Sequence, residues 1–262
     1  MIAIEVIQQV ERTGRLLHTG EIHLARKIEK RDDYIDHLKS VIDNGCFDFL
    51  RRSTVGKAVA DRLRAMSVVT ANLERIADHA VSIVDQTGHF DDWSLTERYG
   101  FEPFLARVLD GLRLVVDAFL EADPARAVRI CQAEVDLDDL YMARFKSLLA
   151  EMMCGRQVPD LVTVLFISHY LERMGDCLLN IGEAILFFKM GERLKFRDYQ
   201  SLRDAVAELS DDGAALADVD LEGIWGTKSG CRIGKLSGSE QLPDGDSRSE
   251  EHTSELQSLL II

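Results

Sequence analysis

A segment that occurs twice constrains the fold of this 262-residue chain more than any other feature. The first copy, residues 72–85, reads NLERIADHAVSIVD, and the second copy, residues 170–183, reads YLERMGDCLLNIGE. Around each copy the apolar residues recur at alternating intervals of three and four positions, which is the spacing of one face of an α-helix. The repeat therefore predicts two related helices, each with its apolar side in the core of a helical bundle.

Turn-forming residues divide the chain up to residue 196 into six helical segments, with almost no signal for strands. The breaks are Thr19-Gly20, Ser53-Thr54 and Thr87-Gly88, and apolar periodic runs also follow Pro103, Pro124 and Pro159. Proline is tolerated as a first helical residue, and Asp123 is of a residue type that caps a helix N-terminus. The expected helices are Ile2–Leu17, Glu21–Leu50, Val55–Gln86, Phe104–Glu121, Ala125–Met153 and Asp160–Met190.

The order of these segments, short, long, long and again short, long, long, predicts an all-α fold of two tandem three-helix bundles related by an internal repeat. We expect the first bundle within residues 1–90 and the second within 101–196, joined by a connection over 88–100. The composition of residues 197–247 predicts an acidic, glycine-containing and largely irregular tail. Residues 248–262 contain RSEEHTSELQS, which resembles the in-frame translation of a sequencing-library adapter, so no functional argument rests on them.

The unusual chemistry of the repeat lies in acidic residues placed four positions apart. On a helix such residues lie on one side, where two like charges cost roughly 0.2–0.5 kcal/mol unless a cation lies between them. Four such pairs occur at related positions of the two repeats. The first acidic set consists of Asp32, Asp36, Glu74 and Asp78, and the second acidic set consists of Glu134, Asp138, Glu172 and Asp176.

Oxygen ligands of this kind suit hard cations such as magnesium, calcium, manganese or ferric iron. Four residues after the last pair of each repeat, Asn180 continues the second row of oxygen atoms and Ser82 continues the first. The second repeat therefore has the richer row of oxygen ligands, and the first repeat has the poorer row. His169 precedes Glu172 by three residues and is a further ligand candidate, whereas His79 is rotated by about 100° from its neighbour Asp78.

Composition excludes several classes of function. The formal net charge is −14 and the Lys and Arg residues form no cluster, so we expect no nucleic-acid binding. No glycine-rich cradle precedes a helix and no basic pocket is indicated, so phosphate binding by the chain itself is not expected. The five cysteines show no CxxC spacing, and the sequence contains neither a signal peptide nor an apolar run of about 20 residues. These features predict a reduced, cytoplasmic protein.

The acidic pairs, the LERIAD and LERMGD segments, AVRI at residues 127–130 and the run PxxxxxLFxxxxLERxGDxxxNI over 159–181 together resemble the PhoU family of phosphate-signalling proteins. The resemblance covers about residues 1–196 and implies a pair of three-helix bundles. It also implies that each acidic set forms one metal site, which takes iron, zinc, manganese or magnesium.

The resemblance further implies a regulator rather than an enzyme. Its implied partners are the phosphate transporter and a sensor kinase, so the chain reaches the membrane only through these partners. A homodimer is the default assembly.

Three alternatives stay open. The chain could be the cytoplasmic regulatory domain of a sodium/phosphate cotransporter. It could also be a carboxylate-metal enzyme, although such an enzyme needs an enclosed pocket, a general base and usually histidine ligands. Finally, Arg75 and Arg173 could pair with acidic residues of a neighbouring helix, so that the acidic rows hold no metal.

Overall fold

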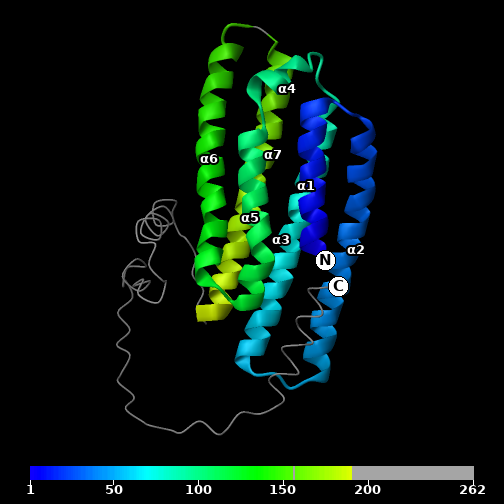
Figure 1. Ribbon diagram of the computed structural model, residues 1–262, viewed down its shortest axis with the longest axis vertical. Helices are drawn as coiled ribbons and strands as arrows, with labels where there is room; N and C mark the ends of the chain where they lie inside the picture. Colours follow the sequence, from blue (N-terminus) through cyan, green and yellow to red (C-terminus); the bar gives the residue numbers. More distant parts are fainter. Residues whose placement is uncertain (156, 191–262) are drawn as a thin grey trace, which may run out of the picture.

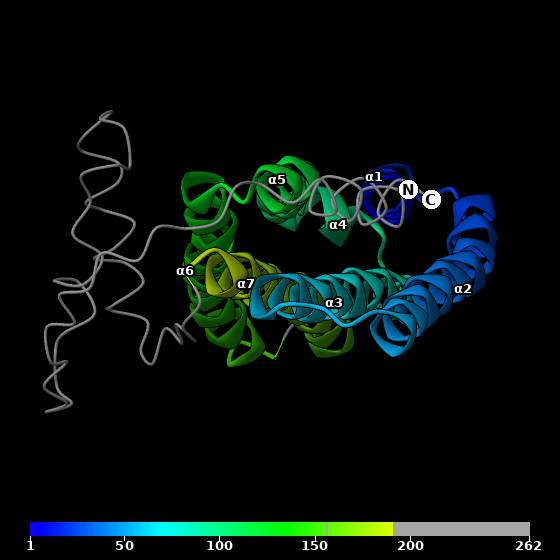
Figure 2. The same cartoon turned by 90° about the horizontal axis from the view of Figure 1, so that it is seen from below.

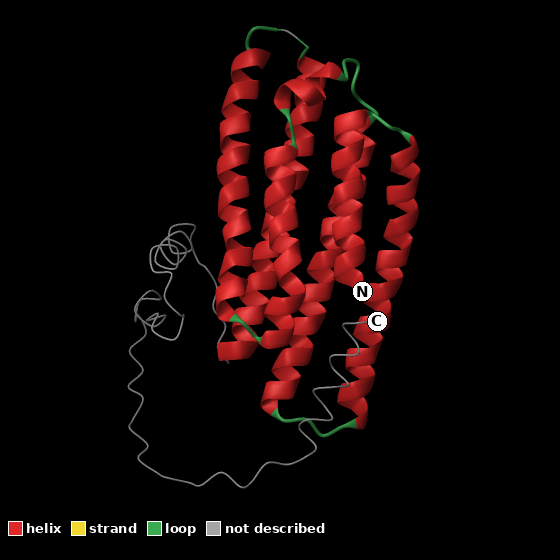
Figure 3. Ribbon diagram, viewed as in Figure 1, coloured by secondary structure: helices red, strands yellow, loops and turns green. Residues whose placement is uncertain are grey.

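The structure is a computed structural model that describes residues 1–155 and 157–190. The predicted tail of residues 197–247, the adapter-like residues 248–262 and the last six residues of the second predicted bundle lie outside the described residues. Within the described residues every element is a helix (Figure 3). The predicted all-α fold class is confirmed.

Seven helices form the described part of the chain, and six of them correspond closely to the predicted segments. The helices are α1 (Ile2–Thr19), α2 (His23–Arg52), α3 (Lys57–Thr87), α4 (Ser94–Tyr99), α5 (Glu102–Glu121), α6 (Pro124–Met152) and α7 (Val158–Met190). The predicted cap of α6 is confirmed, because the Asp123 side chain accepts hydrogen bonds from the backbone N–H groups of Ala125 and Arg126 at 2.8 and 3.3 Å.

The short helix α4 corrects the prediction, which had only a connection between the repeats. Its single turn and a half contains too few residues to show a helical period in the sequence. Tertiary contacts hold it instead: Leu95 is buried in the core, and the Arg144 guanidinium of α6 donates hydrogen bonds to the carbonyls of Tyr99 and Gly100 at 2.7 and 2.9 Å. Gly100 has φ +55°, a conformation that glycine adopts without strain.

The helices form two layers (Figures 1 and 2). Helices α6, α7, α3 and α2 lie in one row, and α5, α4 and α1 lie in the other. Helices α3 and α7, which carry the two copies of the repeated segment, lie side by side at the centre. One buried core runs from the first repeat into the second. Within the described residues, no helix combines the length and apolar character needed to span a bilayer.

The predicted apolar stripes of the repeated helices are confirmed as core faces. Every member of both stripes is buried. On α3 they are Met66, Val69, Leu73, Ile76, Ala80 and Ile83, and on α7 they are Val164, Ile167, Leu171, Met174, Leu178 and Ile181. The spacing of apolar residues therefore sets which side of each central helix faces the core.

Helices α6 and α7 pack closely because α7 has glycine where it meets α6. A Cβ atom on Gly182 would lie 2.7 Å from the carbonyl oxygen of Ala127, and a Cβ atom on Gly175 would lie 3.3 Å from a backbone Cα of α6. At the equivalent positions of α3, 98 residues earlier, the chain has Ala77 and Val84. The two repeats therefore differ in how closely their second and third helices approach.

We expect Gly182→Ala to lower the free energy of unfolding by about 1–2 kcal/mol. Overpacking costs about 1–3 kcal/mol and is hard to relieve against a backbone atom, whereas alanine returns up to about 1 kcal/mol of helix propensity. Urea denaturation followed by circular dichroism measures the difference. The control is Gly56→Ala, because a Cβ atom there meets nothing within 4 Å. Equal stability of the Gly182→Ala variant and the wild type would contradict the close approach of α6 and α7.

Candidate metal centre

The structure brings three members of the first acidic set together between α2 and α3. Carboxylate oxygens of Asp36, Glu74 and Asp78 all lie within 4.8 Å of one another. In the described ranges this is the only group of three His, Cys, Asp or Glu side chains that meet so closely. Carboxylates at such distances are a suitable ligand set for a hard cation.

The fourth member of the first acidic set, Asp32, is tied to α1. Its carboxylate accepts a hydrogen bond from Gln9 Nε2 at 3.1 Å, and the same amide donates to the carbonyl of Ala77 at 3.2 Å. Burial raises the pKa of Asp32, the bond from Gln9 opposes this rise, and nearby carboxylates add to it. Gln9 was not predicted from the sequence, although a glutamine on the buried face of an amphipathic helix was the signal that could have identified it.

The first acidic set has an excess of negative charge. Burial is the main cause that raises the pKa of Asp78 to about 6, and the other three carboxylates of the set add to the rise. One ammonium group opposes them: Lys39 Nζ of α2 lies 2.8 Å from Glu74 Oε1 of α3. The pairing of Lys39 with Glu74 was not predicted from the sequence either, because the distance between them depends on how α2 and α3 pack. One ammonium beside four carboxylates leaves an electrostatic demand for a further cation.

The second acidic set lies on α6 and α7, and two of its members have partners on their own helix. Asp176 pairs with Arg173 at 2.7 Å, and Glu172 Oε2 lies 3.2 Å from His169 Nδ1. Burial raises the pKa of Glu172 to about 7, followed by the charge of Asp176, and Asp138 of α6 adds to the rise. The carboxylates of Glu172, Asp176 and Asp138 therefore interact. Arg173, however, pairs with an acidic residue of α7 itself and not with one of a neighbouring helix.

The predicted rows of ligands do not extend to a third member. Asn180 Nδ2 donates to Asn72 Oδ1 at 3.2 Å and so joins α7 to α3, while Ser82 Oγ donates to the carbonyl of Asp78 at 3.0 Å. Eight residues along a helix correspond to a rotation of about 80° from the starting position, which turns these side chains away from the row. The ranking of the second acidic set above the first stays a prediction, and the closest cluster of carboxylates in the described residues belongs to the first set.

His79 takes no part in this cluster. Its ring lies against Tyr170 of α7, with the ring centroids 6.0 Å apart, and burial lowers its pKa to about 4. This placement agrees with the rotation expected from its position next to Asp78.

Comparison with protein families identifies the family of the chain. The family model described as "PhoU domain" matches residues 2–87 and 104–185, which contain α1–α3 and most of α5–α7. This chain belongs to the PhoU family. All eight members of the two acidic sets lie within the matched residues, and α4 lies between the two matched ranges.

Relatives and solved structures agree with this assignment to the PhoU family. The chain is 28% identical to the phosphate-specific transport system accessory protein PhoU of Escherichia coli, over 71% of this chain and 78% of the relative. It is 27% identical to the PhoU homologue of Clostridium acetobutylicum, over 70% of this chain and 84% of that protein.

The crystal structure of PhoU from Pseudomonas aeruginosa aligns with a TM-score of 0.65 at 22% identity, over 73% of this chain and 93% of that chain. The phosphate transport system regulatory protein PhoU from Streptococcus pneumoniae aligns with a TM-score of 0.69 at 22% identity, over 74% of this chain and 93% of that chain. These two structures support the PhoU fold.

Proposed function

We propose that this chain is an accessory regulator of a phosphate transport system, that it acts in the cytoplasm, and that it works through protein contacts and not as an enzyme. The proposal is supported by its membership of the PhoU family and by the named function of its relatives, most of whose length it matches. The partners we propose are the phosphate transporter and its sensor kinase.

We further propose that the acidic sets hold metal ions. The observation that supports this most strongly is the approach of Asp36, Glu74 and Asp78 to within 4.8 Å of one another. A bound cation supplies positive charge that offsets the repulsion among these carboxylates. Asp32, one turn from Asp36, is the fourth ligand, and Lys39 competes with the ion for Glu74. Iron, zinc, manganese and magnesium are the candidate ions.

The metal content of purified protein tests this part of the proposal. After equilibration with each candidate ion and gel filtration, we expect the wild type to retain an ion. The double variant Asp36→Asn with Glu74→Gln should lose the ion of the first acidic set, because two of its three closest carboxylates become neutral. Glu172→Gln with Asp176→Asn tests the second acidic set in the same way.

A matched control removes two acidic charges from the same two helices away from the cluster. Glu29→Gln on α2 with Asp85→Asn on α3 serves this purpose, since both side chains are exposed. Elemental analysis by mass spectrometry gives the number of ions per chain. A wild type that retains none of the four metals, or a Glu29 and Asp85 variant that loses as much metal as the first-set variant, would refute metal binding by these carboxylates.

A further inference from the structure

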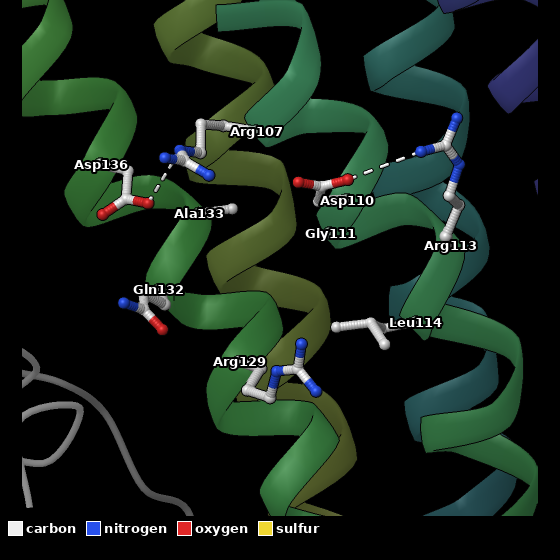
Figure 4. A pocket seen from close by; sticks show the side chains of 9 residues that line it. All are labelled: Arg107, Asp110, Gly111, Arg113, Leu114, Arg129, Gln132, Ala133 and Asp136. Atoms are coloured by element: carbon white, nitrogen blue, oxygen red, sulfur yellow. Dashed lines mark ion pairs between the residues drawn. The ribbon is translucent and has the colours of Figure 1, made fainter. Parts of the chain in front are cut away.

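A polar groove lies between α5 and α6, on residues that the metal proposal does not use. It consists of two adjoining hollows of about 550 and 420 Å³, both lined by Arg107 of α5 and Asp136 of α6. Figure 4 shows the side chains that line the larger hollow. The larger hollow is of the size of a binding site. Two small residues form its floor: a Cβ atom on Gly111 would lie 3.4 Å from the Cβ atom of Ala133 and 2.8 Å from Leu178 Cδ1 of α7.

At the equivalent seam of the first repeat, between α1 and α2, larger side chains occupy the positions that form this floor. With an offset of 102 residues, Gly111 corresponds to Gln9 and Ala133 corresponds to Arg31. Gln9 is fully buried and bonded to α2 and α3, and Arg31 forms an ion pair with the buried Glu5. The Arg31 guanidinium also lies 5.2 Å from the centre of the Tyr34 ring.

Other buried positions of α1 and α5 coincide at this offset. They are Ile2, Ala3, Val6, Val10, Thr13, Leu16 and Leu17 in α1, and Phe104, Leu105, Val108, Leu112, Val115, Ala118 and Phe119 in α5. The backbone arrangement of the repeat is therefore retained. The groove arises because small residues replace large ones at a few positions of the second repeat.

The charged groups of the groove stand on its rim. Arg107 Nε lies 3.1 Å from Asp136 and so links α5 to α6, and Arg113 pairs with Asp110 at 3.5 Å on α5. Arg129 of α6 is exposed, and its side chain has no hydrogen bond or ion pair to any other residue in the described part of the chain. Figure 4 shows that its guanidinium points into the groove toward Leu114. An arginine fork of this kind presents five N–H donors to an acidic group.

We propose that the α5–α6 groove is the docking site for one helix of the phosphate transporter. This inference rests on the proposed accessory function. The groove runs along α5 from Pro103 to Leu114, which corresponds to about 16 Å of helix axis, or three turns. A helix that lays small side chains on the floor and an acidic side chain against Arg129 fits this shape and charge.

Charge reversal at the groove tests the proposal with a control from the other repeat. Arg129→Glu reverses the unpaired charge, and Lys27→Glu makes the same change at the equivalent exposed position of α2. We expect Arg129→Glu to weaken binding of the full chain to the purified phosphate transporter at least tenfold at fixed salt, because it places like charges together. Lys27→Glu should change the affinity less than twofold. Biolayer interferometry measures both.

Filling the groove gives a second and independent variant. Ala133→Arg copies the side chain that closes the α1–α2 seam and should abolish transporter binding, with circular dichroism reporting whether the helical fold is retained. If this variant does not fold, Arg129→Glu alone decides the outcome, since Arg129 is exposed.

The possible results separate the groove from the accessory function. Transporter binding that Arg129→Glu leaves unchanged overturns the docking site and leaves the accessory function intact. A wild type that does not bind the transporter overturns both. Saturable binding of inorganic phosphate or ATP to the wild type, measured by calorimetry and lost in Arg129→Glu, would show that the groove takes a small anion and would overturn the docking of a helix.

Discussion

Arg144→Ala is expected to lower the free energy of unfolding by about 3 kcal/mol. The guanidinium of Arg144 donates to the carbonyls of Tyr99 and Gly100, where α4 ends and α5 begins. It also lies 5.3–5.6 Å from the ring centres of Tyr99, Phe101 and Phe104. Each charge-assisted hydrogen bond contributes about 1.5–3 kcal/mol, and contacts with aromatic faces add about 0.5–1 kcal/mol. Two carbonyls would lose their donor in a partly buried place.

The matched control for this prediction is Lys146→Ala. It removes a positive charge from the exposed side of the same helix and should change the stability by less than about 0.5 kcal/mol. Arg144→Lys should fall between the two, because one ammonium cannot bond both carbonyls and stack on three rings. Urea denaturation in metal-free buffer measures all three. Similar midpoints for Arg144→Ala and Lys146→Ala would show that Arg144 does not hold the α4–α5 junction.

The fold could be predicted from the sequence because the apolar residues recur with a helical period and because the pattern occurs twice. The stripe of α3 from Met66 to Ile83 and its copy on α7 indicated both the helix type and the buried side. Asp123 before Pro124 marked a helix start that the structure confirms. Helix α4 was not predicted because six residues are too few to show a helical period. Its position also depends on Arg144, which is 45 residues from Tyr99 along the chain.

For the candidate site, the sequence predicted the chemical type of the ligands but not how they are arranged in space. The spacing of Glu74 and Asp78 places two carboxylates on one side of a helix, but the approach of Asp36 depends on how α2 packs against α3. No local pattern indicated that Lys39 would pair with Glu74, or that Asn180 would donate a hydrogen bond to Asn72 across the central helices. Contacts between different helices are set by packing geometry and not by local spacing.

The groove between α5 and α6 was missed for a different reason. The three arginines that line it are separated along the sequence, so the absence of a basic cluster in the sequence did not exclude a groove with several arginines. Its floor is formed by the small residues Gly111 and Ala133. Small residues in a sequence do not show whether the space beside them is empty or filled by a neighbouring helix. In the sequence, the groove is indicated only when Gly111 and Ala133 are compared with their larger counterparts in the first repeat, Gln9 and Arg31.

Opposite effects on stability and on metal binding are expected when Asp78 is changed to asparagine. The asparagine keeps the shape of the side chain but removes one of four clustered negative charges, so metal-free protein should become more stable at pH 8. If each like-charge pair costs roughly 0.2–0.5 kcal/mol, the loss of three pairs raises the melting temperature by about 2–4 °C. The same change should lower the affinity for the metal ion, since a neutral amide is a weaker ligand than a carboxylate.

The pH dependence of this difference follows from the raised pKa of Asp78. The pKa is about 6 in the folded chain and is raised from the ordinary value of 3.8, with burial as the main cause. Above pH 6 the carboxyl is ionised in both the folded and the unfolded chain, and the fold bears the cost of its charge. As the pH falls through 6, the folded chain takes up a proton at Asp78 and this cost is lost. The loss continues until the pH reaches the ordinary value of 3.8, where the unfolded chain also takes up the proton. The advantage of Asp78→Asn should therefore be full at pH 8, smaller near pH 5 and smallest near pH 4.

Calorimetric melting of chelator-treated protein between pH 4 and pH 8 measures this difference. The control is Asp85→Asn, which removes the same charge from an exposed position of α3 outside the cluster and should shift the melting temperature by a similar small amount at each pH. An Asp78→Asn variant that is less stable than the wild type at pH 8 would show that the carboxylates do not repel one another in the metal-free fold. A gain in stability combined with lost metal binding would instead mean that the chain tolerates a repulsive cluster because the cluster binds an ion.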